Sequence, residues 1–295
     1  YILSQLDHYI HHDNPIKMLL HCLLLKKIKE LNNNILIQQQ EHEVHIFFND
    51  VIGLEYAKKM LYQYIILKHL YPNYYTSSYI LNQNISILLY GPPGTGKTLL
   101  IEGLVNEFQS IIKKPLYLIK ITPSILLSKY TGEAEKKLNS YISLSIMNQP
   151  SIIFIDEIDA FCISRNQNTE GVGNISRTLL SEFLTQMSRI KKLSSNINVT
   201  IIGCTNTLND IDSAILRRFT CKIVCPLPNE INRKRLIIKF LDNIQYNLSE
   251  NDLNILINKT DQLSCSDIEH FISQTCLIPI HEEFEKNEKN LLKLP

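Results

Sequence analysis

Short apolar runs and longer amphipathic stretches alternate through the middle of the chain. The runs are apolar on both faces, which is typical of strands buried inside a parallel sheet. Each run is too short for a buried helix and is followed by a polar or glycine-containing segment. The predicted strands are Ile85–Tyr90, Leu116–Ile121, Ser151–Ile155, Val199–Cys204 and a short Ile223–Cys225.

Stretches with helical periodicity lie between these runs. Strands that alternate with helices predict an α/β fold with a mostly parallel sheet flanked by helices. The predicted helices are Leu54–Leu70, Leu99–Phe108, Ser124–Leu127, Glu133–Met147 and Ile175–Ile190.

After Pro226 and Pro228 the strand pattern stops. The next three periodic stretches, Glu230–Leu241, Glu250–Lys259 and Ser266–Lys286, all predict helices. We therefore expect a large α/β domain over residues 47–227 and a small all-helical domain over 228–295, with the boundary near Leu227. Residues 1–46 are expected to form a peripheral segment that contains a helix over 16–31 and a polar linker.

Composition restricts the function classes. The 295 residues are 44% hydrophobic, so a sizeable core can form, and a net charge of +1 argues against gripping nucleic acid over the whole surface. The seven cysteines form no CxxC pair, which is typical of reduced thiols in a cytosolic or nuclear protein, and we expect a cytoplasmic location. No apolar run reaches the roughly 18–20 residues that a membrane span needs. Because the chain opens with Tyr1, we expect it to be part of a longer protein.

A phosphate-binding loop is the most specific motif. It matches GxxxxGK[ST], follows a predicted strand and opens a predicted helix. Its glycines let backbone N–H groups surround phosphate oxygens, and the helix directs its positive end at the same anion. The lysine is expected to reach the β- and γ-phosphates, and the threonine hydroxyl to ligate Mg²⁺. The alternative is a glycine-rich turn without a ligand. The motif comprises Gly91, Pro92, Pro93, Gly94, Thr95, Gly96, Lys97 and Thr98.

Polar residues follow two more of the predicted strands, where ligands of open parallel sheets gather. Asp156 is expected to hold the Mg²⁺ through water, and Glu157 to orient and polarise the attacking water. Asn206 follows another strand and is positioned to contact both the γ-phosphate and that water. The alternatives are an ordinary polar strand end and a turn asparagine.

Arg217 and Arg218 follow a short helical stretch over 213–216. Adjacent arginines are usually only solvated. However, Lys97 is otherwise the one obvious positive charge for the transferring phosphate. An arginine supplied by a neighbouring subunit would accelerate hydrolysis by roughly 10³–10⁵, which implies a ring or filament with shared sites.

These pieces, in this order, resemble an AAA ATPase module of the meiotic clade, which contains katanin, spastin, fidgetin and the ATPase that disassembles ESCRT filaments. The fold implied is a P-loop NTPase sheet followed by a small helical lid. The resemblance rests on Asp50–Leu54, Gly91–Thr98, Ser128–Lys136, Pro150–Asp159, Ser181–Met187, Ala214–Phe219, Leu227–Glu230 and Ser264–Ile268.

The resemblance implies roles for individual residues. Ile52 and Gly53 would line the adenine pocket, Asn206 would be the sensor-1 residue, and Arg217 and Arg218 would be the arginine fingers. A first pore loop, which grips a polypeptide in the channel of a hexamer, would comprise Lys129, Tyr130 and Thr131.

The sequence also departs from the family pattern. Cys265 stands where the family has a glycine beside adenine, and Thr178 replaces an arginine of the second pore loop. At the position of Tyr130, many clade members have Trp, whereas spastin-like proteins have Tyr. The family's C-terminal helix, which packs across the ring, would lie beyond Pro295.

The leading functional hypothesis is an ATP- and Mg²⁺-dependent motor that assembles as a homo-hexamer and threads a polypeptide through its pore. Microtubule severing is favoured, with tubulin tails as substrate and a cytoskeleton-associated location. ESCRT-filament disassembly and extraction of membrane proteins are alternatives that use the same motor. A nucleotide-binding scaffold without hydrolysis is a further alternative. A helicase has little support, because the charge is balanced and no aromatic–basic strip is present.

Overall fold

The structure is a computed structural model. It describes residues 46–76, 85–122, 133–161, 172–193, 197–242, 244 and 248–291. The predicted helices over 16–31 and 124–127 lie outside these ranges. So does nearly all of the predicted N-terminal segment.

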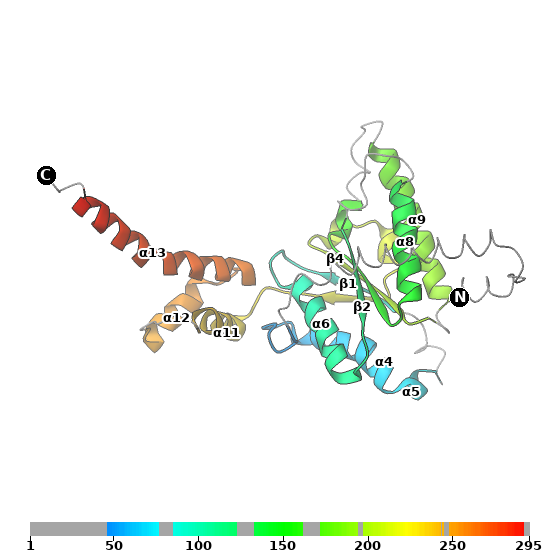
Figure 1. The fold of residues 1–295 in the computed structure, drawn as a ribbon, viewed down its shortest axis with the longest axis horizontal. Coiled ribbons are helices and arrows are strands. Elements are labelled where there is room, and N and C mark those ends of the chain that lie inside the picture. The colour runs from blue at the N-terminus through cyan, green and yellow to red at the C-terminus, as the bar shows by residue number, and fades with distance from the viewer. Residues whose placement is uncertain are drawn as a thin grey trace, which may run out of the picture.

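A parallel sheet forms the centre of the described chain and confirms the predicted fold (Figure 1). The strand order is β2-β3-β4-β1-β5, and every adjacent pair is parallel. This order places β4 between β1 and β3. The strands are β1 (Ser86–Tyr90), β2 (Tyr117–Ile121), β3 (Ser151–Ile155), β4 (Val199–Thr205) and β5 (Cys221–Val224).

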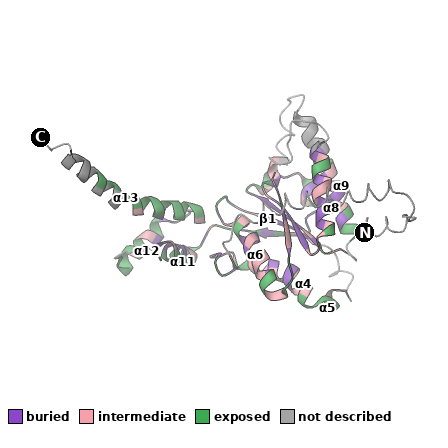
Figure 2. Cartoon of the chain, viewed as in Figure 1, coloured by how far each residue is buried: buried purple, intermediate pink, exposed green. Residues whose placement is uncertain are grey.

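Helices cover both faces of the sheet. On one face, α8 (Glu133–Met147) and α9 (Val172–Lys192) enclose one hydrophobic core, and on the other α3 (Glu55–Leu61) and α6 (Lys97–Ile112) enclose a second. Strands β1, β3 and β4 are buried along nearly their whole length, as their continuous apolar runs predict, whereas the edge strands β2 and β5 are partly exposed (Figure 2). Short helical turns complete this part: η2 (Ile158–Phe161), η4 (Leu208–Asp210) and α10 (Ser213–Leu216).

The prediction of one regular helix over 54–70 is wrong in one respect, because a π-helical turn interrupts it. After α3, the chain makes a π-helical turn, η1 (Tyr62–Ile66), before α4 (Leu67–Leu70) and α5 (Pro72–Thr76). At the junction, the Leu67 N–H bonds to the Tyr62 carbonyl, five residues earlier. Such a turn inserts one residue into the helix. The apolar positions before and after it can therefore face the same core.

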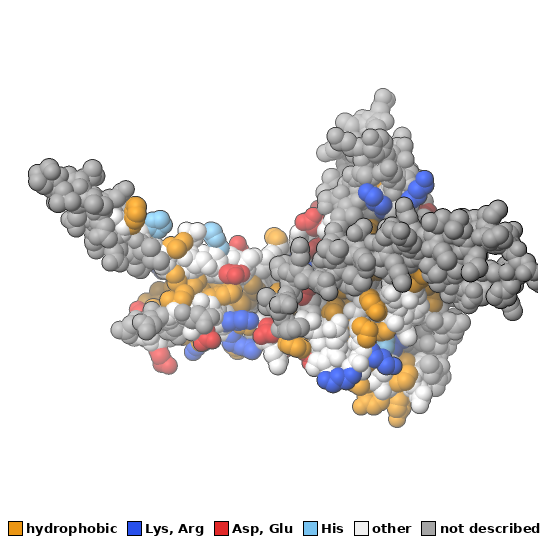
Figure 3. All heavy atoms as spheres, in the orientation of Figure 1, with side chains coloured by type: hydrophobic (Ala, Val, Ile, Leu, Met, Phe, Trp, Pro, Cys, Tyr) orange, Lys and Arg blue, Asp and Glu red, His pale blue; other side chains and the backbone are white. Residues whose placement is uncertain are grey.

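After β5 the chain forms a separate helical unit from α11 (Glu230–Leu241), α12 (Glu250–Lys259) and α13 (Cys265–Leu291). Its small core includes Leu236, Ile257 and Ile268. Hydrophobic side chains gather on the face of this unit seen in Figure 3. None of the helices described is both long enough and apolar enough to cross a bilayer.

Candidate functional site

The carboxyl ends of three adjacent strands meet at one edge of the sheet. The loop over residues 91–96 follows β1, Asp156 follows β3, and Asn206 follows β4. A cavity of about 560 Å³ opens in front of them and is lined by all three. This volume lies within the range of small-molecule sites.

The start of the loop is tied to both neighbouring strands. The Gly91 N–H donates to the Thr205 carbonyl at 3.3 Å, and the Cys225 N–H donates to the Tyr90 carbonyl at 2.7 Å. A Cβ on Gly91 would overlap with the Cys225 carbonyl oxygen. The loop can therefore leave β1 in this direction only because residue 91 has no side chain.

Lys97 is buried at the bottom of the loop. Its Nζ donates to the carbonyl oxygens of Gly91 and Pro92, both at 2.8 Å. Burial lowers the pKa of this ammonium, and the nearby Asp156 carboxylate acts in the opposite direction. An anion entering the loop would offer stronger acceptors than two carbonyls, so the lysine is placed to exchange partners.

Two buried thiols lie close to Lys97. Burial raises the pKa of the Cys225 thiol to about 11 and that of the Cys204 thiol well above its ordinary value. Both thiols therefore stay protonated and neutral at physiological pH. The positive charge of the lysine is left available for a ligand.

Thr98 and Asp156 come together although they belong to different motifs. The Thr98 hydroxyl donates to Asp156 Oδ2 at 3.1 Å. The Asp156 N–H bonds to the Ile121 carbonyl, and its Oδ1 accepts from the Glu157 N–H at 3.0 Å. A hydroxyl and a carboxylate are the hard oxygen ligands that Mg²⁺ takes together with water and substrate phosphates. No cluster of three or more His, Cys, Asp or Glu that could hold a metal occurs in the described ranges.

Glu157 and Asn206 face the same cavity from neighbouring strand ends. The Thr205 hydroxyl holds the backbone around Asn206, because it donates to Asp159 at 2.9 Å and accepts from the Thr207 N–H at 3.1 Å. Glu157 has a positive φ of 51°. An exposed carboxylate and an amide thus both line the cavity in which a water could approach a phosphate.

The helical unit supplies the opposite wall, which the sequence interpretation missed except for Cys265. Leu236, Phe240 and Glu269 line the cavity with Lys239 and Ser266. The spacing 236/240 and 265/269 is four residues, as expected of single helix faces. This four-residue spacing was present in the sequence, but no sequence pattern indicated that these helix faces would cover the phosphate loop.

Direct contacts connect this wall to the phosphate loop and to the segment before α3. The Lys239 ammonium donates to the Asp50 carbonyl at 2.6 Å, and the Ser266 N–H donates to the Gly94 carbonyl at 3.2 Å. Asp50 and Ile52 also line the cavity. Gly53 does not, but a Cβ there would lie 3.0 Å from Asn232 Nδ2 of α11.

Other predicted site residues lie elsewhere. Arg217 and Arg218 are exposed at the end of α10 and do not line the cavity. The lining contains Pro93–Thr98, whereas Gly91 and Pro92 support the loop from behind. Lys129, Tyr130 and Thr131 lie outside the described residues.

The sequence model of the ATPase family associated with various cellular activities (AAA) matches residues 87–227. Vacuolar protein sorting-associated protein 4A of Homo sapiens is 33% identical to this chain over 270 residues, which are 92% of this chain and 56% of the relative. The chain thus spans about half the length of the curated relatives it matches.

Solved structures agree with this similarity. The crystal structure of the FIGL-1 AAA domain in complex with ADP matches with a TM-score of 0.70 and 27% identity, covering 87% of this chain and 83% of that one. A katanin structure described as "Structural Basis for Katanin Self-Assembly" matches with a TM-score of 0.64 and 28% identity, covering 81% and 73%.

Proposed function

Because the chain belongs to the AAA family of ATPases, within its meiotic clade, we propose that it binds ATP with Mg²⁺ in the strand-end cavity and hydrolyses it. The observation that carries this proposal is the hydrogen bond of 3.1 Å between Thr98 and Asp156, which lie 58 residues apart in sequence. It brings a hydroxyl and a carboxylate from two separate motifs into contact, which supports their proposed role as Mg²⁺ ligands.

Each residue has a role in this proposal. The loop N–H groups and Lys97 bind the β- and γ-phosphates, and Thr98 and Asp156 hold Mg²⁺, the latter through water. The bound metal supplies Lewis-acid neutralisation of the phosphate charge. Glu157 accepts a proton from the attacking water, and Asn206 orients that water and the γ-phosphate.

The base pocket belongs to the same proposal. Ile52 and Cys265 both line the cavity, and both are proposed to contact the base. Burial raises the pKa of the Cys265 thiol, so the side chain acts as a small neutral wall rather than as a nucleophile.

We place Arg217 and Arg218 at the active site of a neighbouring subunit. Both are exposed and lie outside their own chain's cavity, and in that cavity Lys97 is the buried cation facing the phosphate position. Sites shared in this way require an oligomer, and a homo-hexamer is the proposed form. The katanin similarity supports self-assembly.

The proposed work of the hexamer is to thread a polypeptide, with Tyr130 and its neighbours Lys129 and Thr131 in the pore. A flat amphipathic ring can wedge between side chains without sequence preference. We favour microtubule severing, and the katanin similarity supports it. ESCRT-filament disassembly is the second candidate, favoured by the similarity to a vacuolar protein sorting-associated protein. A scaffold without hydrolysis is disfavoured, because Lys97 and Glu157 are both retained.

Glu157→Gln and Lys97→Ala test the hydrolytic site. Glu157→Gln should bind ATP normally but turn over about 10²–10⁴-fold more slowly, because it removes the proton acceptor and keeps the shape. Lys97→Ala should lose ATP binding. Equilibrium binding and phosphate release measure the two effects, and Glu107→Gln on α6 is the matched control. Normal turnover by Glu157→Gln, or retained affinity in Lys97→Ala, would contradict the respective role.

A further inference from the structure

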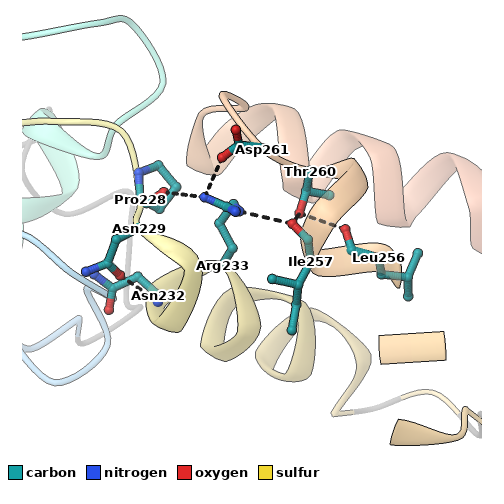
Figure 4. A network of polar contacts seen from close by, with 8 residues as sticks. All are labelled: Pro228, Asn229, Asn232, Arg233, Leu256, Ile257, Thr260 and Asp261. Atoms are coloured by element: carbon teal, nitrogen blue, oxygen red, sulfur yellow. Dashed lines mark hydrogen bonds and ion pairs between the residues drawn. The ribbon is translucent and has the colours of Figure 1, made fainter. Parts of the chain in front are cut away.

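A charged side chain is buried inside the helical unit. Arg233 is 7% exposed. Its Nε–H donates to the Ile257 carbonyl at 3.2 Å, its Nη1 donates to the Pro228 carbonyl at 3.2 Å, and Nη1 lies 3.0 Å from Asp261 Oδ1 (Figure 4). A buried charge is tolerated only when it is paired and hydrogen-bonded, and here three separate acceptors bind the Nε and Nη1 atoms of the guanidinium.

These acceptors come from different parts of the unit. Pro228 lies just before α11, and Ile257 is in the last turn of α12, where its carbonyl also accepts from the Thr260 hydroxyl at 3.1 Å. Asp261 follows α12. The planar fork of Arg233 therefore connects the entry of α11 to the exit of α12, a geometry that the single ammonium of a lysine cannot reproduce.

The chain is anchored on both sides of the segment that joins β5 to α11. Downstream, Asn229 caps α11 by accepting from the Asn232 N–H at 2.9 Å, so Pro228 and Asn229 move with the helices. Upstream, the Cys225 N–H bonds to β1 and its carbonyl abuts the phosphate loop. Two residues, Pro226 and Leu227, lie between the anchored ends. The proline ring fixes one of their four backbone torsions.

The helix that carries Arg233 also carries part of the cavity wall. Leu236 and Phe240 lie three and seven residues after Arg233 and line the cavity opposite the loop over 91–98. Their position relative to the loop depends on the orientation of α11, which is joined to β5 by the short segment just described and is also bonded to the Asp50 carbonyl through Lys239.

We propose that Arg233 is a positioning residue for the nucleotide site. It joins residues 228–261 into one body that pivots at Pro226–Leu227, so that Leu236 and Phe240 meet the nucleoside as a unit while the loop holds the phosphates. This inference rests on the proposed ATP site. It also places the boundary between the two domains at residue 227.

Arg233→Lys tests the inference with two ligands, Mg²⁺–ATP and Mg²⁺–triphosphate. The variant should bind ATP about tenfold more weakly, because a charge-assisted fork is lost and α11 is misplaced. Its affinity for inorganic triphosphate, which has no nucleoside, should be unchanged. Arg235→Lys, exposed on the same helix, is the matched control and should bind both ligands as the original chain does.

Leu227→Gly provides a second variant that leaves the Arg233 network intact. Added backbone freedom at the pivot should again weaken ATP binding more than triphosphate binding. If thermal unfolding shows that Arg233→Lys does not fold, the result for Leu227→Gly tests the positioning role in its place. Equal losses for both ligands, or no loss for either, would overturn the positioning role. If the original chain binds neither ligand, the proposed ATP site itself is wrong.

Discussion

Glu157 has a backbone conformation that residues other than glycine rarely adopt, with φ at 51°. Such a conformation costs about 1–3 kcal/mol and is found mostly at functional sites. Hydrogen bonds hold it in place, since the Glu157 N–H donates to Asp156 and its carbonyl accepts from the Ala160 N–H. The strain directs the carboxylate towards the cavity, where the proposed chemistry needs it.

His69 has an unusual environment for a histidine. Its Nδ1 lies 2.7 Å from the Ile65 carbonyl, and its ring packs edge-on against Phe108 with centroids 4.9 Å apart. Within the part of the chain that the structure describes, the buried Nε2 has no hydrogen-bond partner. Burial lowers the pKa of the ring, and the charges of Lys68 and Lys114 lower it further, whereas the Ile65 hydrogen bond partly opposes the shift.

This lowered pKa predicts a loss of stability in acid. The unfolded chain binds the proton below the ordinary pKa of 6.5, whereas the folded chain resists it. The contribution of His69 is therefore complete above that pH and declines as the pH falls towards the folded pKa. His69→Gln should flatten this dependence in denaturant unfolding at several pH values. It should also cost about 1 kcal/mol through the lost ring contact.

His281→Gln, at an exposed position of α13, is the matched control for exchanging a histidine for glutamine. A pH dependence that persists in His69→Gln would contradict the assignment.

At the scale of elements, the phosphate loop leaves β1 in close contact with the residue that follows β5. The loop residues Gly91, Gly94 and Gly96 all have positive φ. Of these three, only Gly91 has a Cβ position that overlaps with backbone, that of Cys225 just after β5, whereas a Cβ on Gly96 would meet nothing within 4 Å. A side chain at residue 91 is thus opposed by packing, whereas a side chain at residue 96 is opposed by the backbone conformation alone.

Gly91→Ala and Gly96→Ala separate these two effects. Gly96→Ala should lower the free energy of unfolding by about 1–2 kcal/mol, the cost of a left-handed alanine. Gly91→Ala should cost about 2–4 kcal/mol, because β1 and β5 must also move apart. Denaturant unfolding measures both. Equal losses in the two variants would show that the contact with Cys225 is readily relieved.

At the scale of the whole molecule, the cavity exists only because the sheet and the helical unit meet. The loop, Asp156 and Asn206 form one wall, and Leu236, Phe240 and Glu269 form the other. A ligand between them would contact both parts. Nucleotide binding and the angle between the two parts are therefore energetically linked.

The proposed shared site predicts that turnover depends on assembly. ATP turnover per chain should rise with protein concentration, because an arginine from the neighbouring subunit contributes roughly 10³–10⁵ in rate. Stabilised microtubules should stimulate it further if tubulin tails enter the pore. Tyr130→Ala should keep the basal turnover and lose the severing activity. Phosphate release and filament imaging measure these quantities.

Turnover that is independent of concentration would contradict the shared site. Assembly-dependent turnover without stimulation by microtubules would exclude tubulin as the substrate and favour the ESCRT-filament alternative.

Local patterns were sufficient for most of the elements. Helices α8, α11 and α12 have the predicted bounds, and β3 does as well. The π-helical turn at residues 62–66 was missed, because an inserted residue differs from a regular helix only through the core that it packs against. The strained φ of Glu157 was also missed, because no residue pattern around a carboxylate after a strand indicates a positive φ.

The sequence by itself determined the parallel sheet, the phosphate loop and the identity of the polar strand ends, because period, glycine spacing and residue chemistry are local properties. Tertiary structure alone decided that β4 lies between β1 and β3, which brings Asn206 between the two motifs. It also decided which faces of α11 and α13 close the cavity. Strand order and helix docking depend on contacts between residues distant in the chain, and no local pattern encodes them.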